Sequence, residues 1–245
     1  MLLKLDFQKA YDTIDWSALE LVMEEMRFGR KWRCWVMRCV TTASISVLFN
    51  GAPTKPFRMG RGLRQGGSLF PFLFIIMSEV LSRMLENAAN KGLFKGPSVG
   101  VDKIMLTHLQ FADDTLMFCE ADLHYLSLIK ELLLSFQVFS GPAINYDKSA
   151  LIVLGMDDKW AKSATDMLGC LKVQLPIKYL GIPLGANMRK TSSWHCIIEK
   201  VYQRLKVAKE IIKIQRKFLW SANKEGGLYH WLGGKLSNSQ TIKGG

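Results

Sequence analysis

Two short apolar runs that carry aspartates constrain this chain more than any other feature. The first is Leu2-Leu3-Lys4-Leu5-Asp6, and the second runs from Leu109 through the doublet Asp113-Asp114 to Leu116. Short apolar runs of this kind predict buried β-strands. Carboxylates in such runs are costly to bury unless they are paired or hold a metal ion. The sequence therefore predicts neighbouring strands with three acids at their ends.

Acids in this arrangement suit one kind of chemistry. Two adjacent carboxylates at a hairpin corner repel each other, and a divalent cation relieves the repulsion. With a third carboxylate from a neighbouring strand, the set can hold two Mg²⁺ ions roughly 3.5–4 Å apart, which supports in-line phosphoryl transfer. Taken alone, however, Asp113-Asp114 is more simply interpreted as an ordinary polar turn, because Asp favours turns.

The remaining patterns predict alternating groups of helices and hairpins. We expect a helix opened by a capping box at Ser17 and Glu20, and further helices at residues 32–39, 69–89, 123–140, 157–168 and 194–220. Extended segments are expected at residues 2–7, 45–57 around an Asn50-Gly51 turn, 106–119, 144–154 and 178–185. Because strands and helices do not alternate strictly, we expect an α+β fold, with an antiparallel sheet backed by helices.

The charge balance points to a polyanionic partner. The chain has 33 Lys+Arg and 21 Asp+Glu, a net charge of +12, which indicates nucleic acid first and an acidic membrane surface second. Residues 1–150 hold 17 basic and 15 acidic side chains, whereas residues 151–245 hold 16 and 6, a net of +10. The basic stretch at residues 194–220 fits either a nucleic-acid surface or an ordinary solvated helix face.

The cysteines and the hydropathy of the chain indicate the cellular compartment in which we expect it. The five cysteines form no C-x-x-C pair, so we expect no disulfide-linked partner and no zinc module, and each is expected to be a small buried group: Cys34, Cys39, Cys119, Cys170 and Cys196. No apolar run approaches the roughly 20 residues of a membrane span, and the first residues lack the apolar region of a signal peptide. We expect an intracellular protein of the nucleus or cytoplasm, with no membrane partner.

Five patterns occur in one order over residues 2–185. They are an acidic segment at residues 5–16, a Gly-Leu-Arg-Gln-Gly-Gly segment beginning at Gly62, the box Phe111-Ala112-Asp113-Asp114, a lysine-containing segment at residues 140–149, and Tyr179-Leu180-Gly181 with its continuation to Gly185. Together they resemble the motifs of reverse transcriptases of LINE-like, non-LTR retrotransposons, and residues 198–220 are more loosely similar to the region that follows. Five motifs in order are far more specific than any one of them.

The resemblance implies a polymerase palm, a ferredoxin-like antiparallel sheet backed by helices. It implies an RNA-directed DNA polymerase that performs two-metal-ion nucleotidyl transfer with Mg²⁺, or Mn²⁺ in its place. Its partners would be an RNA template, a DNA primer and deoxynucleoside triphosphates. By the resemblance, Asp6 and Asp113 bridge the two ions and Asp114 is a secondary ligand.

Further roles follow by the same resemblance. The backbone from Phe7 to Ala10 would lie along the nucleotide triphosphate, and Gln65, beside Gly66, would contact the nucleotide or template. Tyr11 stands where the family has a steric gate that blocks a 2′-hydroxyl, although a packed aromatic beside the strand is an equal interpretation. Lys148 would protonate the pyrophosphate leaving group, where a lone lysine would otherwise be a solvated side chain.

The chain also departs from the family pattern. Gly67-Ser68 stands where the family has Asp-Pro, so we expect Ser68 to cap the following helix, with Pro71 in its first turn. Only five residues precede Asp6, so we expect the preceding fingers region to be missing and the thumb to be compressed. The expected organisation is a palm at 1–185, a basic thumb-like remnant at 186–222 and a disordered tail at 223–245.

Two functions follow from these features. The first is a reverse transcriptase that is weak or inactive as this fragment, and the alternative is a non-catalytic, nucleic-acid-binding remnant of a retroelement. A different palm-like enzyme, such as a nucleotide cyclase, is disfavoured by the Gln65 and Lys148 segments.

Overall fold

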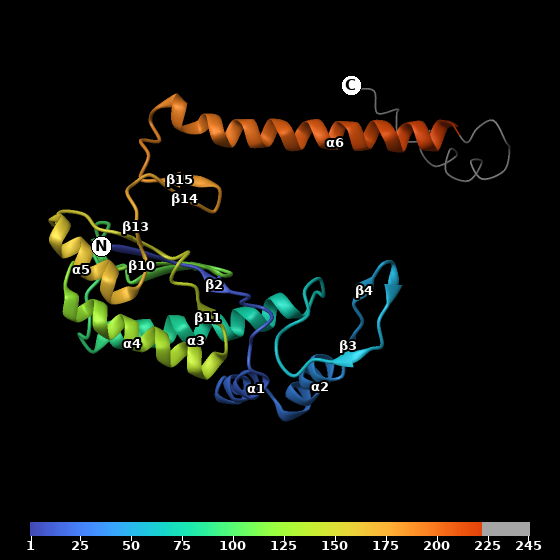
Figure 1. The fold of residues 1–245 in the computed structure, drawn as a ribbon, viewed down its shortest axis with the longest axis horizontal. Helices are drawn as coiled ribbons and strands as arrows, with labels where there is room; N and C mark the ends of the chain where they lie inside the picture. Colours follow the sequence, from blue (N-terminus) through green and yellow to red (C-terminus); the bar gives the residue numbers. More distant parts are fainter. Residues whose placement is uncertain (222–245) are drawn as a thin grey trace, which may run out of the picture. The chain divides into compact units, whose positions relative to one another are not determined.

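The structure is a computed structural model that describes residues 1–221 (Figure 1). Internal contacts divide the chain into one unit, Met1–Leu180, and a second that begins at Gly181, close to the expected boundary after residue 185. The expected disordered tail at 223–245 lies outside the described residues. Within residues 1–221, no helix is both long and apolar enough to cross a membrane.

A five-stranded sheet forms the centre of the first unit. Its strand order is β13-β12-β1-β10-β9, with bounds β13 (Leu171–Lys172), β12 (Ala150–Ile152), β1 (Leu2–Leu5), β10 (Asp114–Phe118) and β9 (His108–Phe111). The three pairs from β12 to β9 are antiparallel, and only β12 and β13 run parallel. The expected antiparallel α+β fold is confirmed, and the parallel edge strand is an addition to it.

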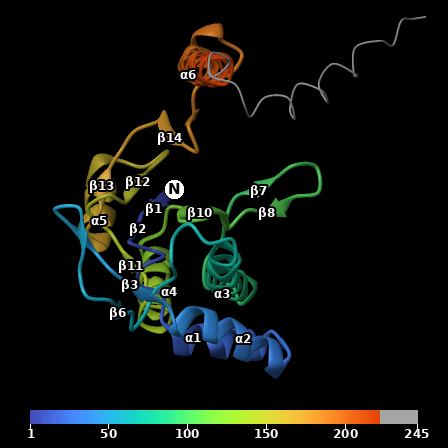
Figure 2. The same ribbon diagram turned by 90° about the vertical axis from the view of Figure 1, so that its right-hand side faces the viewer.

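One face of this sheet is covered by helices. Leu3, Leu5 and Met117 point to the same face and join one hydrophobic core with side chains of the helices. The helices in this core are α1 (Trp16–Glu25), α2 (Arg30–Thr41), α3 (Phe70–Asn90), α4 (Leu123–Ser140) and α5 (Asp158–Leu168). In both views α3 and α4 lie under the sheet, and α1 and α2 lie next to each other (Figures 1 and 2).

Side-chain caps fix where these helices begin, and one expected cap is wrong. Asp122 caps α4, and Asp157, expected as the first residue of its helix, caps α5 instead. The cap of α1 is Asp15, whose Oδ1 accepts from the Ala18 amide at 2.9 Å, so the helix begins before the expected capping box at Ser17. Asp15 rather than Ser17 takes the cap position because the Asp15 amide is already bonded to the Ser140 carbonyl at 2.9 Å.

Two other expectations are corrected. Ser68 does not cap α3, because Leu69 holds the cap position without a side-chain hydrogen bond and Pro71 lies in the first turn, where no amide is needed. The cysteines also divide: Cys119 and Cys170 are buried as expected, but Cys34 and Cys39 are exposed on α2. Burial raises the pKa of Cys119 to about 12 and that of Cys170 to about 11, so neither is a ready nucleophile.

Short paired strands complete the first unit. The expected strand at 45–49 is broken into two pieces, but the Asn50-Gly51 turn is confirmed, with φ of 50° and 82° at its two residues. The pairs are β3 (Ser44–Ile45) with β6 (Phe57–Arg58), β4 (Leu48–Phe49) with β5 (Ala52–Pro53), β7 (Ser98–Val99) with β8 (Ile104–Met105), and β2 (Phe7–Gln8) with β11 (Ala143–Ile144). The last short strand of this unit is β14 (Ile177–Tyr179).

The second unit is mainly one long helix. It contains β15 (Ile182–Leu184), a 3₁₀ turn η1 (Thr191–Trp194) and α6 (His195–Ser221), which confirms the helix expected from residue 194. Lys200 Nζ donates to the Gly181 carbonyl at 3.3 Å within this unit.

Two glycines hold the turn that follows β1 and β2. Gly62 and Gly141 have φ of +86° and +96°, and a Cβ at either would lie 2.3 Å from the Asp12 carbonyl oxygen or 2.1 Å from that of Thr13. Only glycine allows both the left-handed backbone and this close approach. The loop at Gly62 and the end of α4 therefore dock directly onto residues 12–15.

Gly62→Ala should lower the free energy of unfolding well beyond the cost of its backbone conformation. Gly155, with φ of +77° and open space around it, is a matched control. We expect Gly155→Ala to cost about 1–2 kcal/mol, and Gly62→Ala to cost about 1–3 kcal/mol more, because the Asp12 backbone must move. Urea denaturation measures both, and equal losses would contradict the docking.

Candidate active site at the end of strands β1 and β10

The register of the central strands brings the N-terminal acid to the acidic doublet. Leu5 and Thr115 form the last pair of the β1–β10 register, so Asp6, just after Leu5, and Asp114, just before Thr115, stand at the same end of the two strands. Leu5 and Thr115 are fully buried on the helix-covered side, and alternation along β10 directs Asp114 to the other face. Two of the three expected acids therefore lie at one end of the sheet.

The third acid lies in the turn between β9 and β10. Phe111 pairs with Asp114, so the turn consists of Ala112 and Asp113, not of the two aspartates as the sequence pattern indicated. Ala112 has φ of +53°, the left-handed value that a two-residue hairpin needs at its first turn position. A non-glycine residue there costs roughly 1–2 kcal/mol, so the turn that carries Asp113 is strained.

The backbone of Asp6 is fixed by the lysine-containing segment. The Asp6 amide donates to Ser149 Oγ at 3.1 Å, and the Asn145 amide donates to the Asp6 carbonyl at 2.8 Å. Ser149 is fully buried and its Oγ also donates to the Asn145 carbonyl at 2.8 Å. Ser149 and Asn145 lie inside a segment that the sequence identified, but their positioning contacts were not predicted.

Lys148 sits in the same turn, next to Ser149. Its amide donates to Asn145 Oδ1 at 3.2 Å, and its side chain is exposed, with no hydrogen-bond or ion-pair partner within residues 1–221. Its ammonium is therefore available near the strand end that carries Asp6, although the proton-donor role stays a prediction.

Tyr11 is held beside the acidic turn. Its ring stacks on Phe74 of α3, with centroids 4.4 Å apart and planes 11° apart. Burial, and secondarily the negative charge of Asp113, raises the pKa of the Tyr11 hydroxyl. The packed-aromatic interpretation is confirmed, and the same packing fixes the ring next to Asp113, where the predicted gate would have to stand.

Gln65 and Gly66 lie on an exposed loop that docks onto the Tyr11 turn. The Leu63 amide donates to the Tyr11 carbonyl at 2.6 Å, and Gln65 Nε2 donates to Asp12 Oδ1 at 3.3 Å. Gly66 has φ of +91°. Phe7, by contrast, is buried and lies edge-on to Phe136 at 6.1 Å, so only its backbone faces the predicted nucleotide position.

A second tyrosine, which the sequence interpretation did not assign to the site, flanks Asp114. Lys4 Nζ donates to the Lys178 carbonyl of β14 at 3.2 Å, which ties this strand to the sheet face opposite the helices. Burial, and secondarily the charge of Asp114, raises the pKa of the next residue, Tyr179. Asp113 and Asp114 thus each raise the pKa of a different tyrosine, Tyr11 and Tyr179.

The donor set fits divalent metal ions in its chemistry. Asp6, Asp113 and Asp114 supply carboxylate oxygens, the ligand type that Mg²⁺ prefers, and none of these carboxylates has a hydrogen-bond or ion-pair partner in the described part of the chain. Over that same part, no three acids, histidines or cysteines form a ready-made metal cluster. Ligation by all three acids therefore requires their side chains to move closer together.

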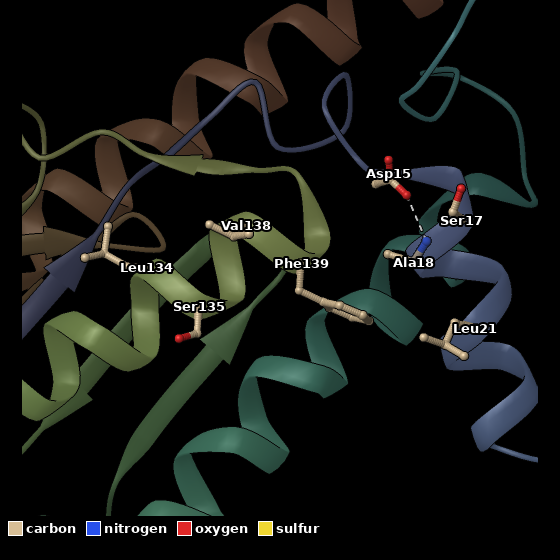
Figure 3. A pocket seen from close by; sticks show the side chains of 8 residues that line it. All are labelled: Asp15, Ser17, Ala18, Leu21, Leu134, Ser135, Val138 and Phe139. Atoms are coloured by element: carbon tan, nitrogen blue, oxygen red, sulfur yellow. Dashed lines mark hydrogen bonds between the residues drawn. The ribbon is translucent and has the colours of Figure 1, made fainter.

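A hollow in the described part of the chain lies elsewhere. A depression of about 850 Å³ lies between the start of α1 and the end of α4, lined by Leu21, Leu134, Val138 and Phe139 among others (Figure 3). Its one carboxylate, Asp15, is already bonded to the Ala18 amide. The depression is mostly apolar and its carboxylate serves as a helix cap, so the candidate site remains the acidic end of the sheet.

Comparison with known protein families agrees with this geometry. Residues 1–184 match the family described as reverse transcriptase (RNA-dependent DNA polymerase). The chain belongs to the reverse transcriptase family. Its ancestry is that of RNA-directed DNA polymerases, and enzymes of this family generally use divalent metal ions.

The relatives identify the branch of the family. An uncharacterised mitochondrial protein of Arabidopsis thaliana is 36% identical over 112 residues, 44% of this chain and 88% of that protein. A 149 kDa protein of transposon TX1 from Xenopus laevis is 27% identical over 76% of this chain and 14% of its own length. The Pol polyprotein of the type-1 retrotransposable element R2 from Popillia japonica is 28% identical over 49% of this chain and 19% of its own. This reverse transcriptase therefore groups with non-LTR retroelements and spans a small part of their polyproteins.

Solved structures support the fold. The telomerase of Candida tropicalis, in complex with a fragment of telomeric RNA, has a TM-score of 0.54 and 15% identity, covering 78% of this chain and 30% of that chain. The corresponding Candida albicans complex has a TM-score of 0.51 and 15% identity, covering 78% and 31%. The expected polymerase-palm architecture is confirmed.

The two flanking tyrosines allow the site geometry to be tested in solution. Asp113→Asn should lower the pKa of Tyr11 and leave that of Tyr179 unchanged, whereas Asp114→Asn should do the reverse. Removing a nearby negative charge makes the phenolate less costly, so each shift is downward. NMR titration of ¹³C-labelled tyrosine side chains measures both values, and the two variants serve as controls for each other. Unchanged tyrosines in both variants would contradict the placement.

Proposed function

We propose that this chain forms the catalytic palm for RNA-templated DNA synthesis, in the nucleus or cytoplasm. The observation that supports it is the β1–β10 register, which ends at Leu5 and Thr115, the residues next to Asp6 and Asp114, with Asp113 in the adjoining turn. The substrates would be an RNA template, a DNA primer and deoxynucleoside triphosphates.

Asp6, Asp113 and Asp114 would hold the metal ions, which we propose to be two Mg²⁺, with Mn²⁺ able to replace them. When bound, the ions would neutralise the charge that develops on the reacting phosphate and would lower the pKa of the primer hydroxyl. Asp6 and Asp113 would contact both ions and Asp114 would contribute secondarily. The free carboxylates of all three residues support this assignment.

The chain's other residues would position the nucleotide. Tyr11, fixed by Phe74, would exclude a 2′-hydroxyl by its ring and so select deoxynucleotides. Gln65 would contact the nucleotide or template from a loop anchored at the Tyr11 turn. Lys148, held at the Asn145 turn, would give a proton to the leaving pyrophosphate.

A non-catalytic role is the second candidate function. Residues 151–245 carry a net charge of +10, with few acids to limit binding to phosphates. A remnant of this kind would bind RNA through that charge, and its affinity would fall steeply with salt whether or not the three acids are present.

Primer extension on an RNA template with Mg²⁺ distinguishes the two functions. We expect slow extension by the unmodified chain and none by Asp113→Ala, because the variant loses a bridging ligand. Asp166→Ala, which removes an exposed acid from α5, is the matched control and should extend normally.

The opposite result has a defined meaning. If the unmodified chain does not extend the primer, and its salt-sensitive RNA binding is the same in Asp113→Ala, the polymerase proposal fails. The non-catalytic function is then the better account.

A further inference from the structure

One long stretch of the chain contains no acidic residue. Between Glu25 and Glu79, residues 26–78 hold nine Lys or Arg and no Asp or Glu. The other 192 residues hold 24 basic and 21 acidic side chains, since 33 − 9 is 24, so they contribute only +3 of the net +12. This stretch alone thus contributes +9, beside the +10 of residues 151–245, and it begins just before α2.

Helix α2 presents this charge on one face. Val36 and Val40 are its buried residues and belong to the core that α2 shares with α1. Lys31, Trp35 and Arg38 are exposed and follow one another at spacings of four and three residues, so they lie along one side of the helix. We name these three residues the α2 stripe, and it spans roughly 10 Å along the helix axis.

The aromatic rings beside the charges are large and solvent-accessible. Trp35 is 55% exposed, and Lys31 Nζ lies 5.1 Å from the centroid of its ring. One turn earlier, Trp32 is 36% exposed and stacks on Phe28, with centroids 4.7 Å apart. The Phe28 contact holds the Trp32 ring beside the stripe.

Arg33 differs from the basic residues of the α2 stripe because its side chain turns inward. Arg33 donates to Glu24 of α1 at 2.7 Å, and its side chain is only 13% exposed. Lys31 and Arg38 have no ion-pair partner within residues 1–221, and the contact of Lys31 with the Trp35 ring lies within the stripe itself.

We propose that the α2 stripe binds single-stranded nucleic acid. A base would stack on the exposed indole of Trp35, and the phosphates on either side of it would be contacted by Lys31 and Arg38, which lie about one helical turn to each side. Stacking needs an unpaired base, so the ligand is a single strand rather than a duplex. The stripe needs none of the three catalytic acids, and this proposal therefore stands apart from the proposed polymerase function.

Binding of short labelled oligonucleotides to the full chain tests the proposal. The probes are a twelve-nucleotide oligouridine and the matching oligothymidine, measured by fluorescence anisotropy at several salt concentrations. Trp35→Leu keeps an apolar side chain but removes the stacking surface, and we expect it to weaken binding about tenfold. Similar affinities for RNA and DNA would indicate that the stripe contacts base faces and phosphates, whereas preference for RNA would add a 2′-hydroxyl contact.

The charge contribution needs its own variant. Lys31→Gln combined with Arg38→Gln should reduce the slope of log affinity against log salt by about 1.4, since each phosphate contact on a single strand contributes about 0.7. Lys91→Gln combined with Lys95→Gln removes the same charge from exposed positions just after α3, outside both basic regions, and should leave the slope unchanged.

A second measurement locates the bound strand. Cys34 is exposed and lies three residues after Lys31 and four before Arg38, on the same side of α2. A bound oligonucleotide should slow the labelling of Cys34 by maleimide, as measured by peptide mass spectrometry. The same slowing is expected in the unmodified chain and in Asp113→Ala. Loss of primer extension in Asp113→Ala with this protection retained would separate the two proposals.

Three results would overturn the inference. The first is unchanged affinity in Trp35→Leu, and the second is an unchanged salt slope in the double charge variant. The third is equal labelling of Cys34 with and without oligonucleotide, including the case in which only anionic lipid vesicles protect it.

Discussion

The antiparallel pairing of β1 with β10 is the constraint on which the rest of this structure depends. It joins the first residues of the chain to a hairpin more than a hundred positions later, with Leu5 opposite Thr115. A slip of one residue would turn Leu3 and Leu5 out of the core and carry Asp6 to the helix-covered face. The buried leucines therefore fix the positions of the acids, although they take no part in the chemistry.

Residues 11–15 join the other motifs to this pairing. The Gly62 amide donates to the Ile14 carbonyl at 2.8 Å, and Trp16 Nε1 donates to the Gly62 carbonyl at 2.7 Å. From the other side, the end of α4 contacts the same turn through Ser140 and Gly141. Backbone groups make most of these hydrogen bonds. Segments 50 to 130 residues apart therefore meet at this turn although few side chains in the sequence mark the contacts.

The sequence predicted most helices and strands and the positions of the three aspartates along the chain. It failed where contacts with distant residues decide the local structure. Local signals sufficed for the Asn50-Gly51 turn and for the helices that follow Asp122 and Asp157, because each residue acts on the backbone beside it. Asp15 displaced Ser17 as a cap because a distant carbonyl holds it. The roles of Ser149 and Tyr179 depend on neighbours far away in the chain. Summing the charge over residues 1–150 hid the acid-free stretch, because the acids that flank it on both sides offset its charge.

Paramagnetic NMR with Mn²⁺ tests the central claim most directly, because the ion broadens only signals from nuclei near it. If the three acids form one site, substoichiometric Mn²⁺ will broaden the amides of residues 5–7 and 112–115 together, and will leave those of α5 sharp. Replacing Asp6 with Asn will abolish the broadening at both places. Broadening of the two segments at different Mn²⁺ concentrations, or broadening at 112–115 that survives the loss of Asp6, would contradict a shared site.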